Sequence, residues 1–217
     1  MSYDLSYLKP FIESSPVVQY PDGKGGKYPY ILLPGLDRAA PADVLNHYLR
    51  GMAEMLEAQI EDATAILTLE SKGFIIAPTL AMNFDRKFIP ARKRKYPGAT
   101  DITIRQTKAY KEKEDAVSEF NIVGIKHEDK ILIIDDMASS GGSINATIDS
   151  LSGYDIVGIG TLYHRADGVQ RIQQHVSDSG LNIPVKGLIK VNFEEVKDKK
   201  GSKVKKFKPV VEEFWQR

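Results

Sequence analysis

The sequence contains no cysteine, no long apolar run and no excess of charge of either sign. The absence of cysteine excludes disulfide bonds, thiolate metal sites and cysteine nucleophiles. No stretch approaches the roughly 20 apolar residues that a membrane-spanning helix needs, and the N-terminus lacks a basic-then-apolar signal pattern. The formal net charge of +1 gives no electrostatic reason to expect nucleic acid or a membrane as a partner. We therefore expect a cytoplasmic protein that binds neither.

The chain is long enough for one α/β domain with a full hydrophobic core. Its 217 residues are 42% hydrophobic and 27% charged, which is ordinary for a globular protein. Because no internal repeat is visible, we treat residues 1–217 as a single domain.

The most informative stretch runs from Lys130 to Leu151. It opens with the apolar run Ile131–Ile134, which is typical of a strand buried on both faces in a parallel sheet covered by helices. The acidic pair Asp135-Asp136 follows, and then a loop of small residues leads into a helical pattern. The loop contains Ala138, Ser139, Ser140, Gly141, Gly142 and Ser143. Free N–H groups and the helix dipole at such a junction favour a phosphate.

The ligand of this loop differs from that of the common nucleotide-binding motifs, since neither GxxxxGK[ST] nor GxGxxG occurs here. Two carboxylates beside a bound phosphate repel it unless hydroxyl donors or a cation compensate their charge. A phosphorylated ribose fits this requirement. Its 5′-phosphate binds in the loop while its 2′- and 3′-hydroxyls donate to Asp135 and Asp136.

The segment DDMASSGGS resembles the motif that binds 5-phosphoribosyl 1-pyrophosphate (PRPP) in type I phosphoribosyltransferases, with Ser140 and Ser143 where threonine is commoner. The resemblance covers about residues 62–165. It implies an α/β fold with a parallel sheet flanked by helices: a core of residues 62–191, and a small hood formed by residues 1–36 and 192–217. It also implies Mg²⁺, held mainly by PRPP, and a homodimer.

Two further stretches resemble pyrophosphate-binding elements of adenine phosphoribosyltransferases. The segment from Glu70 to Phe74 follows a predicted strand at Ala63–Leu69, and Lys72 replaces the usual arginine, which keeps the charge but loses bidentate geometry. The basic stretch from Arg92 to Gly98 follows a second predicted strand. The resemblance implies that pyrophosphate is bound by Ser71, Lys72, Gly73, Arg92 and Lys93.

The chain from Ala99 to Val123 is polar and poorly patterned, and a loop this long in a compact domain is either functional or disordered. By resemblance, residues 93–120 form a flexible loop that closes over PRPP and excludes water. We expect its strands to pair as a hairpin. Adenine enzymes place a loop glutamate near N7 of the base, and Glu112, Glu114 and Glu119 are candidates, with Glu112 assigned as the catalytic one.

The base is predicted less directly. Enzymes for 6-oxopurines carry an aspartate where this sequence has Ser139, and a lysine near Tyr163-His164-Arg165. Together with the adenine-type pyrophosphate stretches, these departures favour adenine as substrate and AMP as product. Tyr30, His164 and Arg165 are the base-side candidates. A 6-oxopurine (hypoxanthine, guanine or xanthine) is the alternative, because His164 or Arg165 can donate to a base oxygen.

A second class of function is a regulator that senses PRPP without transferring it. Such a protein needs a nucleic-acid-binding surface, and neither a helix-turn-helix pattern nor a basic net charge is present. The cationic stretches and the long loop favour catalysis, because sensing does not require water to be excluded.

The remaining segments predict the rest of the fold. Apolar residues from Val44 to Ile60 recur at helical spacing, and strands are expected at Tyr28–Leu33, Asp155–Tyr163 and Ile183–Val191. We interpret the lysine-rich residues 197–208 as a solvated turn, and the aromatics at Phe214-Trp215 as a docking anchor.

Overall fold

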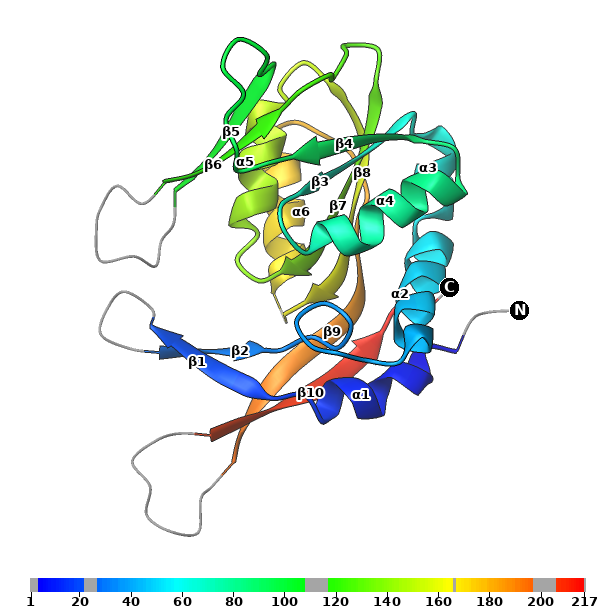
Figure 1. The fold of residues 1–217 in the computed structure, drawn as a ribbon, viewed down its shortest axis with the longest axis vertical. Coiled ribbons are helices and arrows are strands. Elements are labelled where there is room, and N and C mark those ends of the chain that lie inside the picture. The colour runs from blue at the N-terminus through cyan, green and yellow to red at the C-terminus, as the bar shows by residue number, and fades with distance from the viewer. Residues whose placement is uncertain (1–3, 22–26, 108–116, 166, 197–205, 217) are drawn as a thin grey trace.

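The fold is described from a computed structural model, which covers residues 4–21, 27–107, 117–165, 167–196 and 206–216. A six-stranded sheet forms its centre, in the order β10-β9-β8-β7-β3-β4 (Figure 1). The strands are β3 (Ala65–Leu69), β4 (Lys87–Ala91), β7 (Lys130–Ala138), β8 (Asp155–His164), β9 (Val185–Val196) and β10 (Lys206–Phe214). All neighbours run parallel except β10, which pairs antiparallel with β9. The predicted α/β class with a mainly parallel sheet is confirmed.

Helices cover both faces of the sheet (Figure 1). The helices α2 (Ala42–Met55), α3 (Glu57–Asp62) and α4 (Gly73–Asn83) pack on one face, while α5 (Gly142–Ser150) and α6 (Gly168–Asp178) pack on the other. The strand β7 is buried between them, because Leu132 and Ile134 join the first core cluster while Ile131 and Ile133 join the second. The continuous apolar pattern therefore arises from burial on alternate faces, as predicted.

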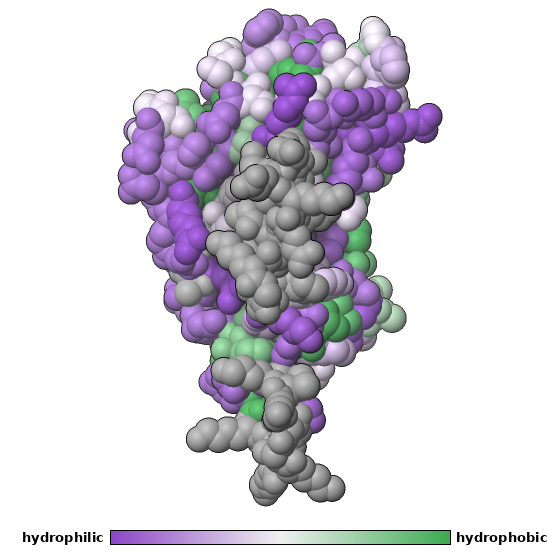
Figure 2. Space-filling model, turned by 90° about the vertical axis from the view of Figure 1, so that its left-hand side faces the viewer, coloured by the Kyte–Doolittle hydropathy of each residue, from purple (hydrophilic) through white to green (hydrophobic). Residues whose placement is uncertain are grey.

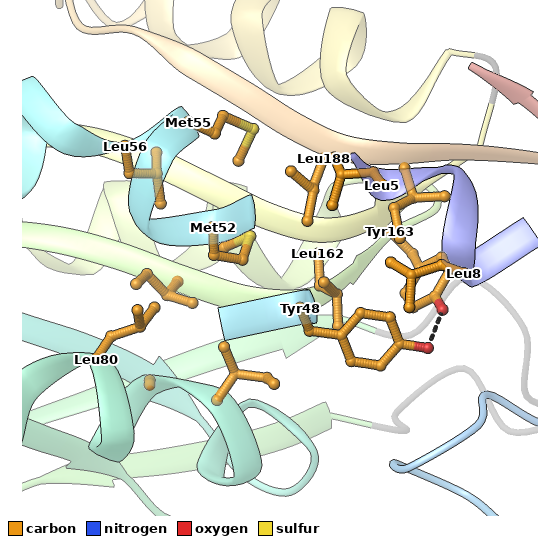
Figure 3. Close-up of a cluster of buried hydrophobic side chains, with 14 of the residues drawn as sticks. Leu5, Leu8, Tyr48, Met52, Met55, Leu56, Leu80, Leu162, Tyr163 and Leu188 are labelled. Atoms are coloured by element: carbon orange, nitrogen blue, oxygen red, sulfur yellow. Dashed lines mark hydrogen bonds between the residues drawn. The ribbon is translucent and has the colours of Figure 1, made fainter. Parts of the chain in front are cut away.

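The first core cluster centres on α2 (Figure 3). Met52 and Met55 pack there with side chains of β8 and β9, such as Leu162 and Leu188. At its edge the buried hydroxyls of Tyr48 and Tyr163 lie 2.5 Å apart, and Tyr48 also donates to the carbonyl of Pro34 at 3.2 Å. The expected single helix to Ile60 is interrupted, since α2 ends at Met55 and α3 begins at Glu57.

Both end segments of the described chain build the hood below the sheet (Figure 1). It contains a 3-10 helix (Leu5–Leu8), α1 (Lys9–Glu13) and the hairpin of β1 (Val17–Pro21) and β2 (Lys27–Ile31). The strand β10 joins it, because the amide of Val211 donates to Glu13 Oε1 at 3.1 Å. Phe214 and Trp215 pack against the first core cluster, as expected of an anchor.

The prediction of a solvated turn up to Lys208 is wrong from Lys206 onward, where β10 begins. Lysines alternate there with Phe207 and Pro209, and this period of two is a strand pattern that the high lysine content concealed. A proline is tolerated because β10 is the last strand of its sheet. The 3-10 helix, α1 and β1 were also not predicted.

The predicted 93–120 loop contains the hairpin of β5 (Ile102–Thr107) and β6 (Val117–Ile122), which confirms the expected pairing. Its buried side chains Ile104, Phe120 and Ile122 extend the second core cluster beside α5. Seen from the side of the two hairpins, the molecular surface is mainly hydrophilic, with separate hydrophobic patches (Figure 2). Within the described ranges, no helix is both long and apolar enough to cross a membrane.

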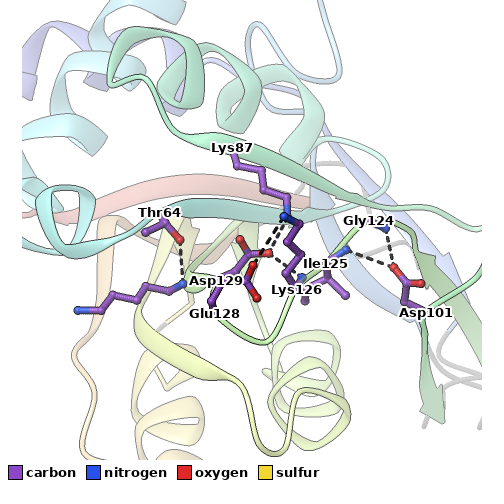
Figure 4. Close-up of polar contacts among 9 residues, drawn as sticks. Thr64, Lys87, Asp101, Gly124, Ile125, Lys126, Glu128 and Asp129 are labelled. Carbon is purple, nitrogen blue, oxygen red and sulfur yellow. Dashed lines mark hydrogen bonds and ion pairs between the residues drawn. The ribbon is translucent and has the colours of Figure 1, made fainter.

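At the amino end of the sheet, where the parallel strands begin, polar side chains fix the connections (Figure 4). Asp129 is buried and its Oδ2 accepts from Lys87 Nζ at 2.6 Å and from the amide of Lys126 at 2.8 Å. Asp101 accepts from the amide of Gly124 at 2.6 Å. These contacts pin the segment that leads from the β5–β6 hairpin into β7.

Candidate active site

The candidate site lies at the carboxyl end of the sheet, between β3 and β7. From β3 the chain continues to β4 on one side, and from β7 to β8 on the other, so the connections diverge between these neighbours. Such a switch point is where open α/β sheets bind ligands. The two motifs from the sequence meet here, since Asp135-Asp136 lie near the carboxyl end of β7, and Glu70 to Gly73 join β3 to the start of α4.

The acidic pair differs in environment between its two members. Asp135 is 8% exposed, and its Oδ1 accepts from the amide of Asp136 at 2.9 Å. Burial, reinforced by the neighbouring carboxylate of Asp136, raises the pKa of Asp135 well above its usual range. Asp136 is partly exposed. The pair therefore presents carboxylate oxygens that are poorly compensated, and a ligand with hydroxyl donors would satisfy them.

The predicted phosphate loop has the expected strand–loop–helix form. Gly141 adopts a positive φ of 78°, where any side chain would also press on Ile172, and α5 begins at the next residue. The hydroxyl of Ser143 donates to Gln106 Oε1 of β5 at 2.9 Å. A Cβ at Gly168 would overlap the carbonyl of Ala138, so α6 packs directly on the loop.

The predicted pyrophosphate loop joins β3 to α4, and the peptide bond between Glu70 and Ser71 is cis. A Cβ at Gly73 would overlap the hydroxyl of Thr68, so only glycine lets the helix start this close to the strand. Glu70 ties this loop to the basic stretch, because its Oε2 accepts from the amide of Lys93 at 2.9 Å and lies 3.5 Å from Arg92 Nε.

Lys72 is held by three groups on three elements. Its Nζ lies 3.1 Å from Asp37 Oδ2, 3.6 Å from Asp136 Oδ2 and 4.5 Å from the centre of the Tyr30 ring. Burial lowers the pKa of Lys72, and burial also raises the pKa of Asp37, with Asp136 adding to the effect. Asp37 was not predicted as a site residue, since the segment Pro34-Gly35-Leu36-Asp37 has only the pattern of a turn.

The basic stretch is also fixed to the β5–β6 hairpin. The amide of Arg92 donates to the carbonyl of Asn121 at 2.9 Å, and the amide of Asn121 donates back at 2.6 Å. The guanidinium of Arg92 lies 5.8 Å from the Phe74 ring centre, and Lys93 Nζ lies 5.9 Å from that of Phe120. The Arg92 guanidinium therefore stands beside the pyrophosphate loop, whereas the Lys93 ammonium lies over the β5–β6 hairpin, and the contact of both with pyrophosphate stays a prediction.

A cavity of about 280 Å³ opens between the phosphate loop and the hood. It is lined by Tyr28, Pro29, Tyr30, Ile31, Met137, Ser139, Ser140, Arg165, Val191 and Phe193. The Arg165 guanidinium lies 5.1 Å from the centre of the Phe193 ring. The lining is mostly apolar with a few polar groups, as a site for a flat heterocycle requires.

The base-side candidates divide at this cavity. Tyr30 and Arg165 line it, whereas His164 does not: a Cβ at Gly187 would overlap its ring, and its Nδ1 lies 3.3 Å from the Arg165 carbonyl. Burial lowers the pKa of His164. Glu112 and Glu114 lie outside the described residues, and Glu119 pairs with Lys95 at 2.6 Å and with Arg105 at 3.1 Å. Met137 and Phe193 were missed because isolated apolar residues at strand ends look like ordinary core.

The described residues contain no group of three or more His, Cys, Asp or Glu side chains that could hold a metal ion by themselves. The carboxylates of Asp135 and Asp136 are nevertheless hard oxygen ligands at the point where a phosphorylated sugar would sit. They fit Mg²⁺, which commonly binds through one or two carboxylates together with substrate oxygens and waters.

Comparison with known proteins agrees with this geometry. Residues 44–196, more than half of the chain, match the model of the phosphoribosyl transferase domain. A hypoxanthine/guanine phosphoribosyltransferase of Methanohalophilus mahii is 30% identical over 199 residues, covering 88% of this chain and 93% of that protein.

Solved structures show the same fold. An adenine phosphoribosyltransferase from Thermoanaerobacter pseudethanolicus aligns with a TM-score of 0.63 at 19% identity, covering 83% of this chain and 98% of that one. The enzyme from Saccharomyces cerevisiae aligns with a TM-score of 0.60 at 22% identity, covering 84% and 99%. The chain therefore belongs to the type I phosphoribosyltransferase family.

Proposed function

We propose that the protein transfers the 5-phosphoribosyl group from PRPP to a purine base and releases pyrophosphate, with a 6-oxopurine as the preferred base. The observation that carries this proposal is the meeting of three elements at one switch point. The acidic pair lies in the last residues of β7 and leads into the phosphate loop, the cationic loop follows β3, and the 280 Å³ cavity opens beside them.

In the transfer, a base nitrogen forms a bond to C1′ of the ribose as the bond from C1′ to the pyrophosphate oxygen breaks, and the base nitrogen loses its proton. Charge develops on the sugar ring and on the leaving group, so the chain has to hold the ribose and stabilise pyrophosphate. Asp135 and Asp136 accept the ribose hydroxyls, the residues from Ala138 to Ser143 bind the 5′-phosphate, and Lys72 lies on the pyrophosphate side.

The other pyrophosphate-side residues are Ser71, Gly73, Arg92 and Lys93. Mg²⁺ bound by PRPP oxygens and by the acidic pair would neutralise charge on the leaving group. We retain Glu112 of the 93–120 loop as a candidate for contact with the base. The two β5–β6 strands already lie against α5 through Gln106 and Ser143, which supports a role for this loop over the sugar phosphate.

The lining of the cavity supports a 6-oxopurine as the base. Arg165 is the charged side chain there, and a guanidinium only donates hydrogen bonds. It matches the O6 acceptor of hypoxanthine, guanine or xanthine, whereas the exocyclic amino group of adenine would oppose it with another donor. The relative from Methanohalophilus mahii, named for hypoxanthine and guanine, supports the same choice.

Adenine is the second candidate. It was favoured by the segments from Glu70 to Phe74 and from Arg92 to Gly98, which resemble those of adenine enzymes. It was also favoured by Ser139, which stands where 6-oxopurine enzymes carry an aspartate, and by the lack of their lysine near Arg165. In the fold, these segments lie on the Lys72 side of the acidic pair and do not line the cavity. These segments therefore support the binding of pyrophosphate more than they indicate which base is bound. The adenine-specific structures share under 25% identity with this chain and support its fold alone.

The test is a turnover assay with purified protein, PRPP and Mg²⁺, offering adenine, hypoxanthine, guanine, xanthine and orotate in parallel. Turnover of hypoxanthine or guanine with little reaction of adenine supports the proposal, and AMP formation alone replaces it with the adenine assignment. If PRPP binds and no base reacts, the protein is a PRPP sensor.

A variant pair tests the role of Arg165. Arg165→Met should reduce the preference for hypoxanthine over adenine by about tenfold or more, because the donor to O6 is lost. Arg171→Met on the exposed face of α6, where Arg171 pairs with Asp167, is the matched control and should leave the preference unchanged.

A further inference from the structure

The chain segment that precedes the matched domain contributes a charged side chain to the site. Asp37 lies seven positions before residue 44, where the match to the family domain begins, yet it makes the shortest ion pair of Lys72, at 3.1 Å. The phenol of Tyr30 lies within 3.5 Å of both oxygens of the same carboxylate. The side chains of Asp37 and Lys72 are 16% and 20% exposed, so the pair is largely shielded from water.

The loop that carries Asp37 is held rigidly from several sides. Asp37 Oδ2 accepts from the amide of Leu33 at 3.0 Å, and the amide of Asp37 donates to the Leu33 carbonyl at 2.8 Å. Arg38 donates to the carbonyl of Phe11 at 2.8 Å, and the hydroxyl of Tyr48 donates to Pro34. Gly35 adopts a φ of 76° against the side chain of Leu45. Asp37 is therefore a fixed point, whereas Lys72 stands on a flexible four-carbon stem.

Lys72 forms an ion pair with Asp37 and a second, longer one with Asp136, whose Oδ2 lies 3.6 Å away. Under the proposed function Asp136 has to accept ribose hydroxyls, and a lysine that paired with Asp136 alone would compete with the sugar. A second, fixed carboxylate 3.1 Å from the ammonium weakens this competition, because Lys72 then pairs with Asp37 more closely than with Asp136.

We propose that Asp37 is a positioning residue that competes with Asp136 for Lys72, and thereby leaves the acidic pair more open to the ribose of PRPP. The role of PRPP in this inference rests on the proposed function, whereas the contact between Asp37 and Lys72 does not depend on it. Asp37 does not touch the reacting atoms and acts through Lys72.

The first measurement needs no ligand. The ε-methylene NMR signals of Lys72, assigned by their loss in Lys72→Met, are compared between variants at one fixed pH. The groups around this ammonium are Asp37, Asp136, Asp135 and Tyr30. Asp37→Asn keeps an oxygen acceptor for the Leu33 amide but removes the carboxylate nearest to Lys72, so these signals should shift. Asp101→Asn, which alters a carboxylate with a similar backbone contact at the amino end of the sheet, should leave them unchanged.

The second measurement is PRPP affinity by calorimetry with Mg²⁺ and without base. Asp37→Asn should weaken PRPP binding about tenfold, because Lys72 then pairs with Asp136 alone and competes there with the ribose hydroxyls. Asp37→Glu should recover part of the affinity. In the Lys72→Met background the Asp37→Asn change should have no further effect, because a residue that acts through Lys72 has nothing left to position.

The outcomes separate the two proposals. Unchanged Lys72 signals in Asp37→Asn, or a further loss of affinity from Asp37→Asn in the Lys72→Met background, overturn the positioning role. If the wild-type protein does not bind PRPP at all, the proposed function and the ligand part of this inference both fail, while the NMR comparison still decides whether Asp37 positions Lys72.

Discussion

At the amino end of the central sheet the buried carboxylate of Asp129 receives two donors within 2.8 Å, from Lys87 and from the amide of Lys126. At the carboxyl end the equally buried carboxylate of Asp135 receives the amide of its neighbour, and a second carboxylate follows it directly. Burial raises the pKa of Asp135 well above its usual range. The buried aspartate at the amino end thus has its donors within the protein, whereas the one at the carboxyl end has acceptor capacity left for a ligand.

This difference shows how stability and function are separated in one sheet. Paired charges at the amino end hold the loop before β7, where the chain needs only a fixed path. At the carboxyl end Asp37, Asp135 and Asp136 surround a single close ammonium, Lys72, among the described residues. Excess negative charge of this kind costs folding free energy, and it is retained at sites where a ligand supplies the missing donors.

The largest loss of activity is expected from a substitution at the carboxyl end of the sheet. Asp136→Asn should lower kcat/KM for phosphoribosyl transfer by about 10²-fold or more, since a charged acceptor for the ribose hydroxyls is lost. Its unfolding midpoint should stay equal or rise, because one of two adjacent carboxylates is removed. Steady-state kinetics and thermal unfolding on the same preparation test both statements. A variant that keeps its activity would remove the acidic pair from the mechanism.

The opposite result is expected at the amino end. Asp129→Ala leaves the Lys87 ammonium and the Lys126 amide without their acceptor and should cost about 1–3 kcal/mol of unfolding free energy. For a chain of this size that corresponds to a fall of several degrees in the unfolding midpoint. Activity per folded molecule should be unchanged. If Asp129→Ala kept the stability of the wild type and lost as much activity as Asp136→Asn, the two ends of the sheet would not differ in role.

The pH dependence of stability tests the environment of Asp135 at the carboxyl end of the sheet. The folded-state pKa of Asp135 is raised above its unfolded value, so the folded protein binds this proton more tightly. Its contribution to stability is therefore greatest below the unfolded pKa of about 3.8 and falls as pH rises through the folded pKa. Asp135→Asn should accordingly gain stability over wild type as pH rises from acid to neutral. A midpoint difference that is independent of pH would contradict this.

The smallest effect is expected for an exposed pair at the amino end. Lys130 Nζ lies 2.7 Å from Asp62 Oδ1, but both side chains are about half exposed, at 45% and 53%. Solvent screens such pairs. Lys130→Gln should therefore leave the unfolding midpoint within experimental error at physiological salt. A clear fall would show that proximity alone, without burial, accounts for the stability of this end.

Local pattern was sufficient to predict the core strands and the phosphate loop. The run Ile131–Ile134 and the change from Asp136 to small residues depend on neighbours in sequence, so periodicity and composition reveal them. Gly141 and Gly73 were likewise predicted as loop residues, and their backbone angle or close packing explains why glycine stands there.

What could not be predicted depends on contacts between distant segments. Asp37 becomes a site residue because its loop is carried against Lys72, 35 positions later, and no local pattern encodes that meeting. Residues Phe193 and Met137 line the cavity only because β9 and β7 end beside the same hairpin. The strand β10 was missed because pairing with β9, and not its own lysine-rich composition, determines its structure.

The partnership of β10 with α1 also bears on the order in which the molecule assembles during synthesis. The sheet from β3 to β9 and its covering helices use chain that leaves the ribosome before β10. The helix α1, made first, depends on Val211 for the contacts of Glu13 and Lys9. The hood can therefore close only when almost all of the described chain is available. During translation the nascent protein should thus form the loop proposed to bind phosphate before the hood wall of the 280 Å³ cavity is complete.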